Sequence, residues 1–370
     1  MDAADALGAQ MRELMLFVPA SGPTGSGEYY RCLALARAVR GHMPGCECHL
    51  LVHRQAGVEL DAELPCHLLE DTPTRQTSRV LDWIERLQPG LVLFDSAGRL
   101  GQLRAARASG AATVWLSDRP GKRRKGFRWR AMRQLDLHLV AAPGERHPAL
   151  STRERWMRRL CPTMAVEFFS TIAPGADVRL AQPLLRSLNV VADAFLLFVA
   201  GGGGYRHAGR PIPELLVEAA GLAHLQCGLP VVVVLGPQYR PGAAGPPTAP
   251  AGVHLLDALP TAQLGALLSC ARAALTGAGS MMVAQGVAAG VPTVLVAAGG
   301  TDQPARIREL VDAGAALTAP LEPPVIAEVV SRLAAEPALG AGLAEAAAAV
   351  GLRNDVERVA GRLARLLAAR

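Results

Sequence analysis

Short apolar runs alternate with amphipathic, helix-like segments along most of the chain. The first run, at residues 14–18, precedes a glycine-rich turn at 22–27, and apolar residues then recur at helical spacing from Glu28 to Val39. A strand, a glycine loop and a helix in this order predict the first unit of a nucleotide-binding βα fold.

The same rhythm continues along the chain, with a helical pattern at 75–87 between apolar runs. A second series of the same kind begins after an irregular stretch at 168–178. The predicted strands lie at 49–52, 91–94, 112–116, 137–140, 195–199, 231–235, 254–256, 273–275 and 293–296. The later predicted helices lie at 212–227, 262–270, 280–289 and within 325–370. Strands that alternate with helices favour parallel sheets.

The pattern therefore predicts an α/β protein with two Rossmann-like domains that face a cleft. We place a loose tail at 1–12, an N-terminal domain at 13–168, a linker at 169–180 and a C-terminal domain at 181–370. The last helix would return to the N-terminal domain. A length of 370 residues agrees with two domains, because single cores rarely grow beyond about 250–300 residues.

Composition excludes several other classes of protein. The first ten residues hold two aspartates and no basic cluster, so we expect no secretory signal there. No uninterrupted apolar run is long enough to predict a membrane span. The seven cysteines are an odd number for a disulfide framework, and we expect reduced thiols in a cytoplasmic protein. Cys46, Cys48 and His49, with Cys66 and His67 nearby, read as buried residues of strands rather than as a zinc site.

The positive charge is concentrated in the first half of the chain. The net charge is +6, and residues 119–133 contain eight Lys or Arg, no acid, and the aromatic residues Phe127 and Trp129. Such a surface attracts phosphate groups or anionic lipid. We expect Arg123, Arg124, Lys125 and Arg128 to face an anionic acceptor or a membrane surface; a solvated basic helix face is the alternative. No nucleic-acid recognition motif accompanies the cluster, so no nucleic acid is expected.

The most informative segment is residues 275–303, which run from a strand through a glycine turn, a helix, Gly290-Val-Pro292 and a strand to a polar loop. Gly277 and Gly279 leave N–H groups open at a helix N-terminus, where a diphosphate is stabilised. This segment resembles the C-terminal domain of two enzyme families with the glycosyltransferase B fold. One is the inverting N-acetylglucosaminyltransferase that forms lipid II, and the other is the nucleotide-sugar hydrolase of pseudaminic acid synthesis.

The resemblance implies a donor site in the C-terminal domain. Four segments would contribute to it: the glycine loop after strand 195–199, the base-recognition region, the second glycine turn with its helix, and the polar loop. The residues are Gly201, Gly202, Gly203, Gly204, Arg206, Leu256, Gly277, Gly279, Ser280, Met281, Gln285, Thr301, Asp302 and Gln303. Gln285 stands where both families have a glutamate that binds the ribose, so it keeps an acceptor oxygen without the charge. We expect UDP as the nucleotide.

The N-terminal loop, Gly25, Ser26 and Gly27, resembles the same families, and the run from Arg31 to Ala36 is especially similar to the hydrolase. Both families have a histidine where this chain has Glu28. Glu28 is therefore the candidate general base; the alternative is a favourable acid in the first turn of a helix. Asp95 and Asp118 follow predicted strands at an edge that faces the cleft. They would contact the acceptor or act as bases, or else cap the following helices.

Residues 273–301 contain no Asp or Glu, so the paired-glutamate signature of retaining enzymes is absent there. The resemblance implies an inverting, metal-independent glycosyltransferase without a cofactor. It would move a sugar from a nucleotide-sugar donor to the hydroxyl of a glycan, phosphorylated or lipid-linked acceptor, at the inner face of the cytoplasmic membrane. A nucleotide-sugar hydrolase is the alternative, with a non-hydrolytic epimerase third. A non-catalytic nucleotide-sugar-binding protein also stays open, because the histidine and the glutamate of both families are replaced.

Overall fold

The computed structural model describes residues 13–20, 22, 27–56, 58, 60–143, 145, 147–174, 177–242 and 245–369, and the side chains of Ser280, Ala284, Val287 and Ala288 are not described. The predicted tail at 1–12 and the loop residues Gly25 and Ser26 lie outside these ranges.

The first sheet has seven parallel strands in the order β3-β2-β1-β4-β5-β6-β7. These strands are β1 (Leu14–Pro19), β2 (Glu47–His53), β3 (Cys66–Leu69), β4 (Leu91–Asp95), β5 (Ala112–Ser117), β6 (Leu137–Ala141) and β7 (Ala165–Phe169). Its helices are α1 (Gly27–His42), α2 (Thr77–Leu87), α3 (Leu100–Ala108), α4 (Pro120–Gly126), α5 (Trp129–Met132) and α6 (Thr152–Leu160). The central strands β4 and β5 are buried at every position, as expected for a parallel sheet covered on both faces.

The second sheet has six parallel strands in the order β12-β11-β8-β13-β14-β15. They are β8 (Leu196–Val199), β11 (Val231–Val234), β12 (Val253–Leu256), β13 (Ala273–Gly277), β14 (Thr293–Val296) and β15 (Leu317–Thr318), and a small hairpin joins β9 (Arg206–His207) to β10 (Arg210–Pro211). The accompanying helices are η1 (Val178–Ala181), α7 (Gln182–Ser187), α8 (Ile212–Cys227), α9 (Thr261–Ser269), α10 (Ser280–Ala288), α11 (Gln303–Asp312), α12 (Pro323–Ala335) and α13 (Pro337–Ala349). The predicted α/β class with two Rossmann-like sheets is confirmed.

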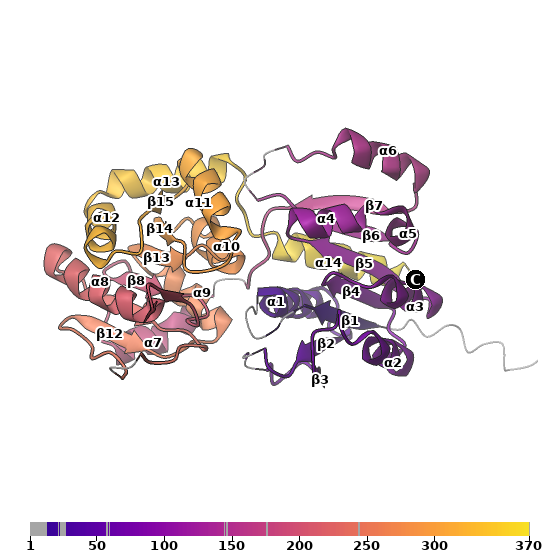
Figure 1. Cartoon of the computed structure of the whole chain (residues 1–370), viewed down its shortest axis with the longest axis horizontal. Helices are drawn as coiled ribbons and strands as arrows, with labels where there is room; N and C mark the ends of the chain where they lie inside the picture. Colours follow the sequence, from indigo (N-terminus) through magenta and orange to yellow (C-terminus); the bar gives the residue numbers. More distant parts are fainter. Residues whose placement is uncertain are drawn as a thin grey trace, which may run out of the picture.

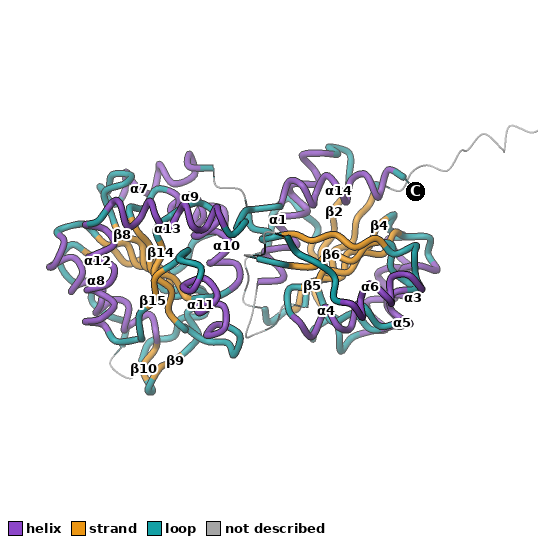
Figure 2. The backbone as a smooth tube through the Cα atoms, turned by 90° about the horizontal axis from the view of Figure 1, so that it is seen from above, coloured by secondary structure: helices purple, strands orange, loops and turns teal. Residues whose placement is uncertain are grey.

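Figure 1 shows the two sheets in separate lobes that lie side by side. The last helix, α14 (Val356–Ala368), leaves the C-terminal lobe and packs against α1, where Val359, Ala360 and Leu363 enter the core of the first sheet. Figure 2, seen from above, also places α14 beside α1.

The chain crosses between the lobes twice, and the two crossings are hydrogen-bonded to each other. The backbone N–H of Thr171 donates to the carbonyl of Arg353 at 3.2 Å, and the backbone N–H of Asp355 donates to the carbonyl of Thr171 at 2.8 Å. The buried Asp355 carboxylate accepts from the N–H of Ser170 at 2.7 Å. This connection fixes one side of the space between the lobes.

Among the described residues, no helix is both long and apolar enough to cross a bilayer.

Candidate active site

A cavity of about 480 Å³ lies between the two lobes, a size that suits a small-molecule ligand. Its N-terminal wall comes from α1 and the loop after β5, and its C-terminal wall from the loops after β8, β13 and β14. The predicted site residues that line it are Gly27, Glu28, Asp118, Gly201, Gly202, Gly279, Met281, Gln285, Thr301, Asp302 and Gln303.

Sheet order places three carboxylates of the first lobe at one edge. Strands β1, β4 and β5 are neighbours, so the residues that follow them meet at their carboxyl ends. Glu28 lies in the first turn of α1, Asp95 ends β4, and Asp118 follows β5.

Two buried cations hold these carboxylates. Arg31 donates from Nε and Nη2 to the two oxygens of Asp95 at 2.7 and 2.9 Å, and from Nη2 to Asp118 at 3.0 Å. The Nζ of Lys122 lies 3.0 Å from Asp118, 3.2 Å from Asp95 and 3.4 Å from Glu28. Arg119 donates to Glu28. We call this group of three carboxylates and three cations the charge cluster; its members are Glu28, Asp95, Asp118, Arg31, Arg119 and Lys122.

The charge cluster keeps Glu28 and Asp118 ionised. Burial raises the pKa of Glu28, but the charges of Lys122 and Arg31 lower it by more, so the pKa lies below the ordinary value. Asp118 follows the same balance, and its pKa lies far below the usual range. The surrounding carboxylates outweigh the effect of burial on Lys122 and raise its pKa. A carboxylate that faces the cavity is therefore deprotonated at neutral pH.

Asp95 departs from its predicted role. Its side chain is fully buried, does not line the cavity, and is bound on both oxygens by Arg31. Asp95 therefore anchors Arg31 and does not contact an acceptor. The alternative that Asp95 and Asp118 cap the following helices is also wrong, because Arg99 and Arg119 hold the cap positions of α3 and α4.

The C-terminal wall is built from glycine turns. Gly201 and Gly203 have φ of +68° and +78°, a region that favours glycine. A side chain at Gly203 would also collide with the carbonyl oxygen of Leu235. Gly203, Gly204, Leu256 and Gly277 do not line the cavity. The side chain of Ser280 lies outside the described part.

Arg206 lies outside the cavity, in contrast to its predicted place in the donor site. It is exposed on the β9–β10 hairpin, where it donates to the carbonyl of Gly209 at 3.0 Å.

Gln285 lines the cavity and has a buried, unpaired acceptor. Its side chain is buried, and its Nε2 donates to the carbonyl of Thr261 at 3.3 Å. Within the described residues, its Oε1 has no hydrogen-bond partner, and neither has the Oε1 of Gln303. Buried polar atoms are nearly always satisfied, so these two amide oxygens, on residues that line one cavity, are candidate acceptors for a ligand.

Sequence reasoning missed three cations that line the cavity, Arg31, Arg119 and Arg306. Arg306 donates to the carbonyl of Ala278 at 2.6 Å and to Asp302 at 2.7 Å, one helical turn away. The i,i+4 spacing of Asp302 and Arg306 was a visible signal. Arg119 directly follows Asp118, but it was counted as part of the basic stretch.

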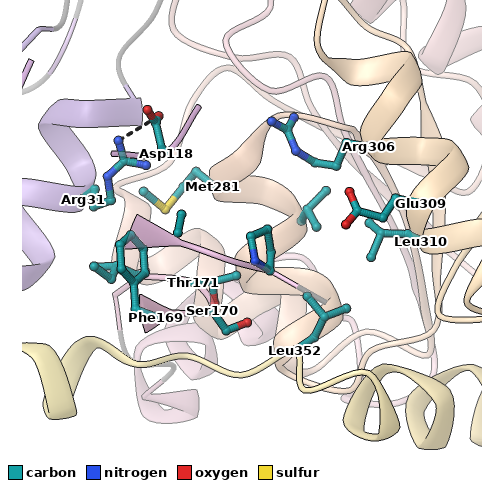
Figure 3. Close-up of a pocket in the computed structure, with 14 residues that line it drawn as sticks. Arg31, Asp118, Phe169, Ser170, Thr171, Met281, Arg306, Glu309, Leu310 and Leu352 are labelled. Atoms are coloured by element: carbon teal, nitrogen blue, oxygen red, sulfur yellow. Dashed lines mark hydrogen bonds and ion pairs between the residues drawn. The ribbon is translucent and has the colours of Figure 1, made fainter. Parts of the chain in front are cut away.

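A smaller cavity of about 60 Å³ adjoins the first, and Arg31, Asp118, Met281 and Arg306 line both. Figure 3 shows Met281 between the Arg31–Asp118 pair and the far wall. Leu310 and Leu352 belong to that wall, whereas Phe169 lies on the side of Arg31.

The basic stretch is only partly free. Arg123 donates to both oxygens of Glu154 at 2.8 Å, so the prediction that it faces an acceptor or membrane is corrected. Arg124, Lys125 and Arg128 are exposed, and we call these three the basic surface. The nearby helix α6 has no buried residue, and its Trp156 is 58% exposed.

The cysteine-histidine group gives no metal site in the part of the chain that the structure describes. Cys46 and Cys48 are buried with their sulfurs 4.0 Å apart, and the rings of His49 and His67 are joined by a 2.8 Å hydrogen bond.

No protein-family model matches the sequence, and no curated protein matches it significantly. Several solved structures nevertheless share its fold over nearly the whole chain. The spinosyn forosaminyltransferase SpnP is 18% identical with a TM-score of 0.65, covering 97% of this chain and 100% of its own. The glycosyltransferase VinC, solved in complex with dTDP, is 16% identical with a TM-score of 0.59, covering 96% and 100%. MurG of Acinetobacter baumannii is 17% identical with a TM-score of 0.56, covering 95% and 99%. At such identities the likeness shows a shared fold.

Proposed function

We propose that this chain, which has the glycosyltransferase B fold of those structures, transfers a sugar from a nucleotide-sugar donor to an acceptor hydroxyl. One observation carries the proposal: the charged Glu28, the glycine turns and Gln285, whose Oε1 has no partner among the described residues, line one cavity between the lobes. A carboxylate base, an anion-binding turn and a hydrogen-bond acceptor are the groups that such a reaction needs. The resemblance to the hydrolase gains no support from the structures named above.

The donor would lie along the C-terminal wall. The N-terminus of α10 and the turn at Gly201 and Gly202 would bind the diphosphate through backbone N–H groups. Gln285 would accept a hydrogen bond from the ribose. UDP is our first choice of nucleotide, and dTDP, which VinC binds, is the second.

Glu28 would act as general base and take the proton of the acceptor hydroxyl. The freed oxygen attacks the anomeric carbon from the side opposite the diphosphate, so the configuration inverts. The bond between this carbon and the diphosphate breaks, and its electron pair stays on the leaving oxygen. We propose that cationic side chains and the helix N-terminus stabilise this charge without a metal.

The experiment is to incubate the protein with a panel of UDP- and dTDP-sugars and to measure nucleotide release with and without glycan or lipid-linked acceptors, each with and without EDTA. Release that depends on an acceptor and resists EDTA supports the proposal. Equally fast release without any acceptor would identify a nucleotide-sugar hydrolase. Absence of release with every donor would favour a non-catalytic binding protein.

We further propose an anionic, phosphorylated or lipid-linked acceptor, presented at a membrane. The support is the basic surface together with the exposed Trp129 and Trp156 nearby, at 43% and 58%. Cationic and aromatic side chains on one exposed region suit an anionic lipid interface.

A further inference from the structure

Arg119 is held more loosely than the other cations that line the cavity in the described part of the chain. The Arg31 side chain is buried and forms ion pairs with Asp95 and Asp118. The Arg306 side chain is 17% exposed and forms an ion pair with Asp302. The Arg119 side chain is 52% exposed. It can turn toward a ligand without stripping Glu28 or Asp118 of cations, because both acids keep Lys122 at 3.4 and 3.0 Å.

The position of Arg119 lets it act on either wall. Its backbone is extended at the start of α4, and its guanidinium contacts Glu28 and lies 3.4 Å from Asp118. Its charge also reaches the opposite wall: burial raises the pKa of Asp302, Arg306 lowers it by more, and Arg119 lowers it further. A donor diphosphate between the walls would present about two negative charges to this arm.

We propose that Arg119 is a donor-operated switch. In the unliganded protein it pairs with Glu28; when the donor binds, its guanidinium moves to the diphosphate and leaves Glu28, still beside Lys122, open to the acceptor proton. The inference rests on the proposed function. The electron pair of the breaking bond then collects on the diphosphate oxygen beside Arg119, while the proton goes to Glu28. Coupling the two events removes one of the cations that lower the pKa of Glu28, and so makes it a stronger base, only when a donor is present.

The test is calorimetric measurement of UDP affinity in wild type, Arg119→Gln, Glu28→Gln and the double variant. We expect Arg119→Gln to weaken UDP binding about tenfold, as for one charge-assisted hydrogen bond, and to leave uridine binding unchanged. Glu28→Gln should tighten UDP binding severalfold, because Arg119 loses its competing partner. This gain should vanish in the double variant. Arg130→Gln removes an exposed arginine from the neighbouring helix α5 and serves as the control for net charge.

Equal UDP affinity in wild type and Arg119→Gln would overturn the switch while donor binding stands. An undiminished gain from Glu28→Gln in the double variant would do the same, since the effect would then not pass through Arg119. Equal losses for UDP and uridine would also overturn it, because they indicate general damage to the cavity. Wild type that binds neither UDP nor dTDP would contradict the proposed function itself.

Discussion

Glu28 gains its candidate role from the residues around it. A carboxylate with a lowered pKa is a weaker base, but it is deprotonated across the physiological pH range. Asp95 shows the contrast within the same charge cluster, because full burial and a two-oxygen bond to Arg31 remove it from the cavity. Glu28 and Asp95 are both carboxylates, and they differ in role because they differ in exposure to the cavity and in their partners.

Replacing Glu28 by Gln keeps the shape of the side chain and removes the proton acceptor. We expect the transfer rate to fall by about 10²- to 10⁴-fold, while UDP still binds. The measurement is the initial rate of nucleotide release in the presence of acceptor. Glu63→Gln, which alters an exposed glutamate outside the cavity, is the control.

The wild-type rate should also depend on pH in a set direction. The pKa of Glu28 lies below its ordinary value of 4.5. Glu28 therefore stays mostly ionised as the pH falls to 4.5, and it is protonated only at lower pH. Activity should therefore persist down to at least this pH. Unchanged turnover in Glu28→Gln would remove Glu28 from the mechanism.

Gln285 should contribute to nucleotide affinity. Gln285→Ala removes the free Oε1, and we expect UDP binding to weaken about tenfold, in line with about 1–1.5 kcal/mol for a hydrogen bond. Ser331→Ala is a matched control, since Ser331 also has a buried, unpaired oxygen but lies on α12, away from the cavity. Equal UDP affinity in Gln285→Ala and wild type would exclude the ribose contact.

At the scale of elements, the best-predicted parts are those with a strong local pattern. The glycine turns followed by helices α1 and α10 are visible in the sequence because glycine and helical periodicity are local signals. The edge strand β3 was missed, since it has four residues and three of them are not fully buried. The charge cluster could not be predicted, because Arg31, Asp95 and Lys122 are far apart in the chain and meet only through the order of the strands.

At the scale of elements, we predict that the basic surface, carried by α4 and the residue before α5, binds anionic membranes. Changing Arg124, Lys125 and Arg128 together to Glu should weaken binding to anionic phosphatidylserine vesicles at least about a hundredfold, since each basic residue contributes about 1 kcal/mol near such a surface. Vesicle cosedimentation measures the effect.

A control triple with the same change of charge is Arg186, Arg240 and Arg308 to Glu, all exposed and all in the C-terminal lobe. Equal losses in both triples would reduce the effect to net charge and contradict an oriented surface.

At the scale of the molecule, the two lobes depend on the hydrogen-bonded crossings between them. Asp355 is the central group: besides the N–H of Ser170, it accepts from Arg353 and Arg358 at 3.0 Å each. Asp355→Ala leaves the Ser170 donor unpaired, and we expect the free energy of unfolding to fall by about 1–3 kcal/mol. Chemical denaturation measures this loss. Glu218→Ala, which removes an exposed pair with Arg210, should leave the unfolding midpoint unchanged, and an equal loss there would contradict the role of the crossing.

The central claim, that the cavity between the lobes binds a nucleotide sugar, is tested most directly by thermal unfolding of the wild-type chain with UDP, dTDP, GDP, ADP and their sugars. A ligand that binds the native state raises the melting temperature in proportion to the logarithm of its excess over the dissociation constant. We predict a concentration-dependent rise with UDP or dTDP and at least one of its sugars. An unchanged melting temperature with every nucleotide, at concentrations up to the millimolar range, would contradict the account and leave only the fold.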